Sequence, residues 1–316
     1  MLNIPDRLQN FRRQMKKEKE GFAVTDCDDF SWGKEVKAPS GCCLYHQEDL
    51  IMNFSLPQGL EEDLLKRLEL VYGIGPVTAN KLRSQGTKKL SDLAGIEKWQ
   101  VKSAFILEAI YQKKWEVLKK AGAIDYEILM FFRPEDFIVI DIETTGLSNT
   151  LPLFLVGLLQ LSEGKMRLHQ FLARDFQEEK PLLEMVKSIL ENGMVLVSFN
   201  GKAFDWPYLK GRYTMHRLPI DWEPRHLDLL PPARRCYRGK FQDCRLKTLE
   251  QEVLQLRRIK DVPGEMIPVL YHEFVKTGDF RIIKGIIEHN KQDLLSMVYL
   301  LSNIVNVQRA QHDNFS

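Results

Sequence analysis

Long apolar runs are missing from this sequence. None of its hydrophobic stretches approaches the roughly 20 residues that a membrane-spanning helix needs. The N-terminal segment, "MLNIPDRLQNFRRQMKKEKEGF", also lacks the continuous apolar core of a signal peptide. We therefore expect a cytoplasmic protein with no membrane partner. Its 316 residues, of which 44% are hydrophobic, predict about two globular domains.

Cysteine is scarce, and charge of one sign does not dominate. The five cysteines show no framework spacing, which excludes a disulfide-rich scaffold. Cys27, Cys42, Cys43 and His46 match no standard zinc pattern, so we interpret the cysteines as ordinary reduced thiols. The net charge of +2 predicts no partner by itself. Within residues 225–260, however, ten Lys or Arg face four acids, which fits either a solvated loop or a track for a polyanion.

The pattern along the chain predicts three regions. Residues 1–57 show little periodicity, apart from a short strand expected at 41–50. Residues 58–122 carry leucines at helical spacing and are expected to be helical. Residues 123–316 contain early strands followed by alternating strands and helices, which is typical of an α/β domain with a mixed sheet flanked by helices. Strands are expected at 136–141, 152–160, 166–172 and 194–198, and helices near 178–192, 203–213, 246–255, 265–277 and 280–306.

Two carboxylates end the first apolar strand of the third region. In "FIVIDIETTGL", Asp141 and Glu143 follow four apolar residues. Residues i and i+2 of a strand face the same side, so these acids are expected to project together. A divalent cation between them would remove their repulsion. The alternative is a strand that ends at Asp141 and leaves both acids solvated.

Two more acids stand beside dense apolar sequence. Asn200-Gly201 follows the apolar strand "MVLVSF", and Asp205 begins the next expected helix. Asp293 lies in a long amphipathic helix, and His289, four residues earlier, shares its face. Each acid can be read as a helix-surface residue, yet an unpaired charge beside apolar sequence is costly.

These motifs together resemble the DEDD-type 3′–5′ exonucleases, which have a ribonuclease H-like fold. The resemblance rests on Asp141-x-Glu143, Asn200-x4-Asp205 and His289-x3-Asp293 and covers about residues 130–306. The segments "LDLLPPARR", "CRLKTLEQEVL" and "RRIKDVPGEMIPVLYHEF" are similar to the YprB-like branch.

The resemblance implies a two-metal mechanism. Asp141, Glu143, Asp205 and Asp293 would hold two Mg²⁺ or Mn²⁺ ions, one activating a water and the other stabilising the leaving 3′ oxygen. Glu143 would also contact the terminal 3′-hydroxyl, and His289 would orient or deprotonate the water. The family motif is usually Tyr-x3-Asp or His-x4-Asp, so a histidine at the tyrosine spacing is a departure. A structural histidine is the alternative.

Further residues are expected to support the site or to bind nucleic acid. Asp228, in "HLDLL", is expected to be a strand-end residue with a positioning role, and the alternative is a fifth acid near the site. The residues assigned to nucleic-acid binding in this part of the chain are Asn200, Arg234, Arg235 and Lys247.

A glycine turn in the helical region resembles a helix-hairpin-helix motif. In "VYGIGPVTANKL", Gly73 and Gly75 allow close backbone approach, and the next helix N-terminus can face a phosphate. Lys81 and Arg83 follow on that helix. Such contacts would bind a duplex backbone without reading sequence. The alternatives are a plain helical turn and a protein-interaction module.

The combined prediction is a metal-dependent 3′–5′ exonuclease that acts on nucleic acid, with DNA favoured over RNA. Its domains would be an accessory region at 1–57, a helix-hairpin-helix region at 58–122 and an exonuclease domain at 123–316. A non-catalytic nucleic-acid adaptor and a structure-selective endonuclease are the alternatives.

Overall fold

A computed structural model describes residues 32–51, 60–162, 164–258 and 261–313. The first expected region is thus described only from residue 32, and Cys27 lies outside the described residues.

One mixed sheet forms the centre of the described chain. Its order is β1-β2-β5-β4-β3-β6-β7. Strands β3, β4 and β5 form an antiparallel meander, and β6 and β7 continue the sheet parallel to β3. The predicted α/β class with a mixed sheet is confirmed. The strands are β1 Lys34–Ala38, β2 Gly41–Ile51, β3 Phe137–Thr144, β4 Leu153–Ser162, β5 Lys165–Leu172, β6 Val195–Ser198 and β7 Arg225–Asp228.

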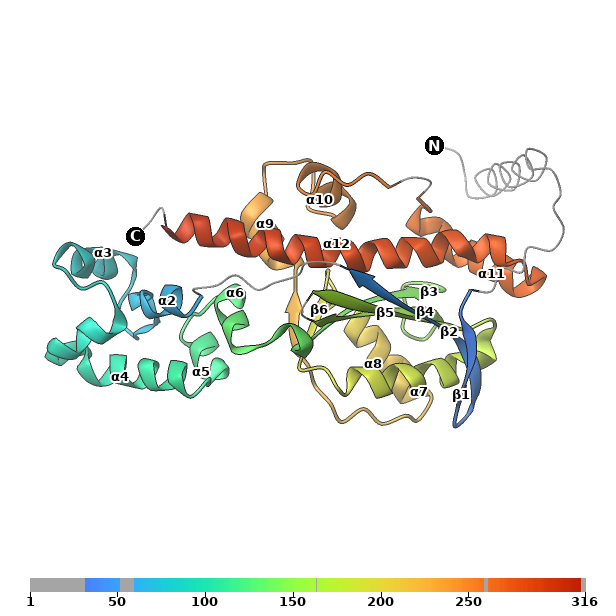
Figure 1. Cartoon of the computed structure of the whole chain (residues 1–316), viewed down its shortest axis with the longest axis horizontal. Helices are drawn as coiled ribbons and strands as arrows, with labels where there is room; N and C mark the ends of the chain where they lie inside the picture. Colours follow the sequence, from blue (N-terminus) through green and yellow to red (C-terminus); the bar gives the residue numbers. More distant parts are fainter. Residues whose placement is uncertain (1–31, 52–59, 163, 259–260, 314–316) are drawn as a thin grey trace.

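Helices cover both faces of this sheet. Helices α7 and α8 lie on one face, and the long helix α12 runs along the other (Figure 1). The helices of this part are α7 Glu179–Leu190, α8 Asp205–Met215, α9 Leu230–Tyr237, α10 Leu246–Glu252, α11 Ile267–Thr277 and α12 Phe280–Asp313, with 3-10 turns at Phe176–Glu178 and Gly264–Met266. Although α12 has 34 residues, no helix within the described ranges has an apolar stretch of the length needed to cross a membrane.

The helical region shares the core under α12. Leu64 and Leu118 belong to the same buried apolar cluster as Leu159 of β4 and Leu301 of α12. The elements are α2 Leu60–Leu65, α3 Pro76–Ser84, α4 Glu97–Tyr111, α5 Trp115–Lys120 and α6 Asp125–Ile128, with 3-10 turns at Leu68–Leu70, Leu90–Gly95, Leu129–Phe131 and Pro134–Asp136.

Strands β1 and β2 extend the sheet with residues from the expected N-terminal accessory region. The pairing of β2 with β5 runs from Leu44 opposite Leu172 to Ile51 opposite Lys165. The short strand expected at 41–50 is therefore a full strand of the main sheet. The domain limits at residues 57 and 122 remain a proposal.

A glycine lets α12 approach the centre of the sheet. Gly157 of β4 lies in register between Asp141 of β3 and Gln170 of β5. A Cβ atom at Gly157 would lie 2.1 Å from Oδ1 of Asn290 and 2.7 Å from Cδ1 of Leu294, both on α12. The missing side chain thus makes room for Asn290 directly above Asp141.

Gly157→Ala is expected to lower the free energy of unfolding by about 1–3 kcal/mol, the usual cost of overpacking a core. The new methyl group has to push Asn290 and Leu294 away from the sheet. Chemical denaturation measures the change, and Gly95→Ala is the matched control, because a Cβ there meets no atom within 4 Å. Equal stability of the two variants would contradict this packing.

Candidate active site

Strand β3 brings two carboxylates to the face of the sheet that α12 covers. Its residues alternate between the two sides, and Phe137 and Val139 join the core beneath α12, whereas Ile138 joins the opposite core. Asp141 and Glu143 continue the first series. Both interact electrostatically with Asp293 on α12.

Asp205 lies near these carboxylates, at the start of the helix that follows the parallel strand β6. Strand β6 ends at Ser198, and Asn200 turns the chain with a positive φ of 66°. A Cβ at Gly201 would lie 2.9 Å from Oδ2 of Asp205, so the tight turn leads directly to this carboxylate at the start of α8.

Asp228 at the end of β7 stabilises this turn through hydrogen bonds. Its carboxylate accepts hydrogen bonds from the backbone N–H groups of Asn200 at 2.8 Å, Lys202 at 3.1 Å and Leu230 at 3.0 Å. The side chain is 5% exposed. With its oxygens used in this way, Asp228 positions the loop that carries Asp205.

Burial and neighbouring carboxylates raise the pKa of all four acids. Burial is the largest cause for each of them, and the charge of Asp293 further raises the pKa of Asp141, Glu143 and Asp205. The pKa of Asp205 rises to about 7, against the pull of the backbone N–H groups of Asp205 and Ile142. So many buried like charges are unfavourable without a cation among them.

An amide pair fixes Asp141. Asn290, fully buried on α12, donates through Nδ2 to Oδ2 of Asp141 at 2.8 Å and to its backbone oxygen at 3.1 Å. Gln170 of β5 in turn donates to Oδ1 of Asn290 at 2.8 Å and to the carbonyl of Ile287 at 2.9 Å. Sequence reasoning missed both amides, and the glycine in β4 is the signal that a close contact was needed there.

His289 has a carboxylate partner on the side away from Asp293. Its Nδ1 lies 2.7 Å from Oδ1 of Asp261, and its Nε2 lies 3.6 Å from Oδ2 of Asp293. A carboxylate only accepts, so Asp261 fixes a proton on Nδ1. Nε2 is then the nitrogen that faces the carboxylate cluster. Asp261 also pairs with Lys247 at 2.8 Å.

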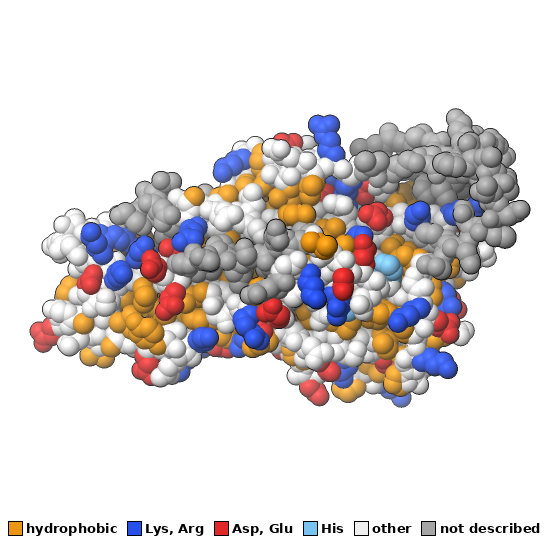
Figure 2. Space-filling model, in the orientation of Figure 1, with side chains coloured by type: hydrophobic (Ala, Val, Ile, Leu, Met, Phe, Trp, Pro, Cys, Tyr) orange, Lys and Arg blue, Asp and Glu red, His pale blue; other side chains and the backbone are white. Residues whose placement is uncertain are grey.

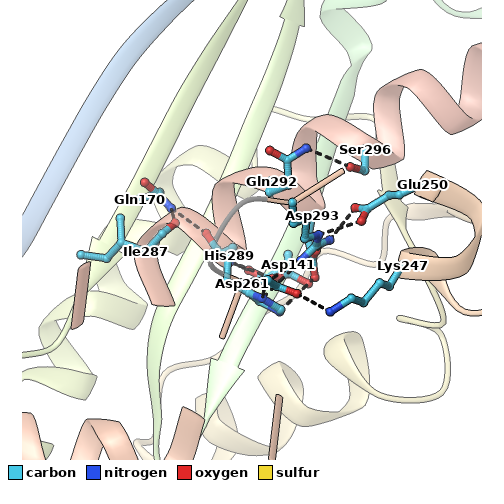
Figure 3. A network of polar contacts seen from close by, with 12 residues as sticks. Asp141, Gln170, Lys247, Glu250, Asp261, Ile287, His289, Gln292, Asp293 and Ser296 are labelled. Atoms are coloured by element: carbon cyan, nitrogen blue, oxygen red, sulfur yellow. Dashed lines mark hydrogen bonds and ion pairs between the residues drawn. The ribbon is translucent and has the colours of Figure 1, made fainter. Parts of the chain in front are cut away.

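An arginine already lies among these acids. Arg258 donates to Oε2 of Glu250 at 2.7 Å and also to Asp293, and its Nη1 lies 3.4 Å from Oδ1 of Asp261. Figure 3 shows Asp141, Asp261, His289 and Asp293 converging beside α12, with Glu250 and Lys247 reaching in from α10. Arg258 therefore supplies positive charge to the cluster.

The donor set suits a hard divalent cation. Clustered carboxylate oxygens are the ligands that Mg²⁺ and Mn²⁺ prefer, and the raised pKa values show charge that lacks compensation. Within the described ranges, no group of three or more Asp, Glu, His or Cys side chains is arranged to bind a metal ion without rearrangement. Asp293 instead contacts Arg258, so ion binding requires these side chains to rearrange.

The predicted hairpin residues lie away from these acids in sequence, and the structure gives them different surroundings. Gly73 has a φ of +92°, and a Cβ there would lie 3.2 Å from the Trp99 ring. Gly75 caps the N-terminus of α3, and Lys81 is exposed. Arg83 pairs with Glu69 through both terminal nitrogens, at 3.0 and 3.1 Å.

The basic stretch 225–260 is not a simple loop. It forms β7, α9 and α10 with their connections, and Arg234 and Arg235 are exposed on α9. Arg225 instead stacks on Trp115, with its guanidinium carbon 4.6 Å from a ring centroid, so not every cation of the stretch is open to a ligand.

A family model matches more than half of the chain. A model of the RNase H superfamily matches residues 138–305. The uncharacterized protein YprB of Bacillus subtilis is 39% identical over 166 residues, which are 51% of this chain and 40% of YprB, so the chain spans well under two thirds of that relative. A family B DNA polymerase from Pyrobaculum calidifontis aligns with a TM-score of 0.42 at 15% identity, over 51% of this chain and 23% of the polymerase.

Proposed function

Because the chain belongs to the RNase H superfamily, we propose that it is a metal-dependent 3′–5′ exonuclease of the DEDD type that acts on nucleic acid, with DNA favoured. The observation that carries the proposal is the cluster of Asp141, Glu143, Asp205 and Asp293, contributed by β3, α8 and α12, in which Glu143 and Asp205 are buried and the other two are partly buried. A cluster of four carboxylates that one arginine only partly compensates has little structural use, whereas metal-assisted phosphodiester hydrolysis requires clustered carboxylates.

Each acid has a proposed role. Asp141, Glu143, Asp205 and Asp293 hold two Mg²⁺ or Mn²⁺ ions, and Glu143 also binds the terminal 3′-hydroxyl. When bound, the ions would activate a water and stabilise the leaving oxygen. Asn290 keeps Asp141 in place through the bonds from its Nδ2.

His289 is proposed to orient the attacking water or to take its proton. Asp261 supports this role, because it fixes the proton on Nδ1 and leaves Nε2 toward the carboxylates. Asp261 is therefore a positioning residue that acts through His289.

The pattern of cleavage products separates the proposal from its alternatives. A 5′-labelled strand incubated with Mn²⁺ should shorten stepwise from its 3′ end, and a blocked 3′ end should stop the reaction. Internal fragments from the blocked strand would indicate an endonuclease. Binding without any cleavage would indicate an adaptor. DNA and RNA strands of the same sequence, single-stranded and duplex, test the expected preference for DNA.

A second proposal is that the turn before α3 binds phosphates of the nucleic-acid backbone. The N-terminus of α3 has no side-chain cap, so its N–H groups are available to an anion. Tyr72 beside the turn is 85% exposed, and Nζ of Lys102 lies 5.2 Å from its ring centroid. Figure 2 shows Lys and Arg side chains, with acids interspersed, over the end of the molecule that α3 occupies.

Lys81→Glu is expected to weaken duplex binding by about tenfold at low salt and by less at high salt, because the contacts are electrostatic. Lys81 is exposed, so the change leaves the fold intact, unlike replacement of Gly73 against Trp99. Fluorescence anisotropy across a salt series measures binding, with melting temperature in parallel. Lys120→Glu makes the same charge change at another exposed position, and equal effects of the two variants would count against the hairpin.

A further inference from the structure

Glu250 anchors Arg258 beside the carboxylate cluster. Glu250 of α10 is fully buried. Its carboxylate accepts a hydrogen bond of 2.7 Å from Nε of Arg258 and a second one from Nη2. This two-point pairing fixes the plane of the guanidinium. A buried carboxylate left without its arginine would be strongly unfavourable, so the two side chains stay together.

The other edge of the guanidinium faces the proposed reaction centre. Nη2 donates to Asp293, and Nη1 lies 3.4 Å from Oδ1 of Asp261. Nη1 also lies 3.2 Å from Nδ1 of His289, but with the proton of the ring on Nδ1 this approach is not a hydrogen bond. The Arg258 side chain is only 8% exposed. Its position is thus defined by two sets of contacts, one with Glu250 and one with the site.

The contact with Asp293 competes with a divalent ion for the carboxylate oxygen Oδ1. An ion there would repel the guanidinium and compete for the oxygen that Nη2 now contacts. Since Glu250 retains the arginine, the freed N–H groups remain at the edge of the site. Buried donors without an acceptor are costly, and a phosphate group of the substrate is the anion brought to this place.

We propose that Arg258 is a phosphate-binding residue of the site: it neutralises Asp293 before metal binds, and afterwards, still held by Glu250, it contacts a phosphate of the nucleic acid. This inference rests on the proposed nuclease function for the identity of the anion. The fixed fork geometry of arginine suits two phosphate oxygens, which a lysine cannot match.

Arg258→Met tests both parts of the proposal, and Arg258→Met/Glu250→Gln is measured in parallel because it leaves no buried carboxylate without a partner. Calorimetric titration with Mn²⁺ alone should show several-fold tighter binding than in the wild-type protein, because no guanidinium competes for Asp293. Anisotropy with a fluorescent single-stranded DNA in Ca²⁺, which takes the same oxygen ligands, should show binding weaker by about tenfold, the scale of one charge-assisted hydrogen bond. Arg258→Lys should bind DNA with intermediate affinity.

Arg257→Met is the matched control, because it removes the same charge at an exposed position one residue away. A control that weakens DNA binding as much as Arg258→Met would reduce the effect to general electrostatics and overturn the proposal. Unchanged DNA affinity in Arg258→Met, whatever happens to Mn²⁺ affinity, would leave Arg258 as a counter-ion only. The binding readouts need no turnover, so failure of the nuclease proposal would appear separately, as a wild-type protein that cleaves nothing.

Discussion

Asp141→Asn is expected to abolish cleavage, with a loss of at least about 10³-fold, since removing even one preorganised electrostatic group costs about 10²–10³ in kcat. The substitution keeps the shape of the side chain, and the new amide oxygen can still accept the bond from Asn290. It removes the charge of a group whose pKa is raised first by burial and then by Asp293, Glu143 and Asp205.

The same variant separates loss of function from loss of folding. The pKa of Asp141 is raised in the folded protein, so its ionised form disfavours folding at neutral pH. Without metal, Asp141→Asn should therefore melt no lower than the wild-type protein. With Mn²⁺, only the wild-type protein should gain stability. Asp221→Asn, at an exposed position, is the control, and wild-type turnover in Asp141→Asn would remove the metal-site hypothesis.

His289→Ala is expected to lower turnover by about 100-fold or more, the scale of general acid–base catalysis, while Mn²⁺ affinity is retained. His272→Ala, at an exposed position, should change neither quantity. A fall in metal affinity would instead make His289 a ligand, and unchanged turnover would make it a structural residue. Higher activity in His289→Tyr would show that the histidine is a compromise at the tyrosine spacing.

A double-mutant cycle tests the part played by Asp261. If Asp261 acts only by orienting His289, adding Asp261→Leu to His289→Ala should cost little further turnover, although Asp261→Leu alone should be strongly impaired. Additive losses would show that Asp261 has a separate role, through its contacts with Lys247 or Arg258.

Much of the fold follows from local pattern. Apolar runs predicted strands close to β3, β4 and β6, because these strands are largely buried on both faces and read as nearly continuous hydrophobic segments. The strand expected near β5, in contrast, includes charged and polar residues and is exposed at Lys165 and Arg167. The pairing of β2 with β5 was out of reach, since the two strands are far apart in sequence. The strand end expected at Asp228 is the end of β7, whereas the short helix α9 was not predicted.

The residues of the candidate site likewise fall into those that the sequence predicted and those that it did not. Asp141, Glu143, Asp205 and Asp293 could be assembled from motif order, and the structure places them together. Their partners depend on tertiary register that no local pattern encodes. Asn290 reaches Asp141 only because Gly157 lies opposite it in β4. The segment after α10 is rich in charged residues and gave no sign of a role in the site. In the structure, its Arg258 contacts Asp293 and its Asp261 contacts His289.

The most direct test of the central claim is a time course with a 5′-labelled single-stranded DNA and purified protein. Mn²⁺ is added, removed with EDTA and then supplied again. A single metal-dependent carboxylate site predicts stepwise shortening from the 3′ end that stops with EDTA, resumes with Mn²⁺ and is absent in Asp141→Asn. Cleavage that continues in EDTA, or that Asp141→Asn performs at the wild-type rate, would contradict it.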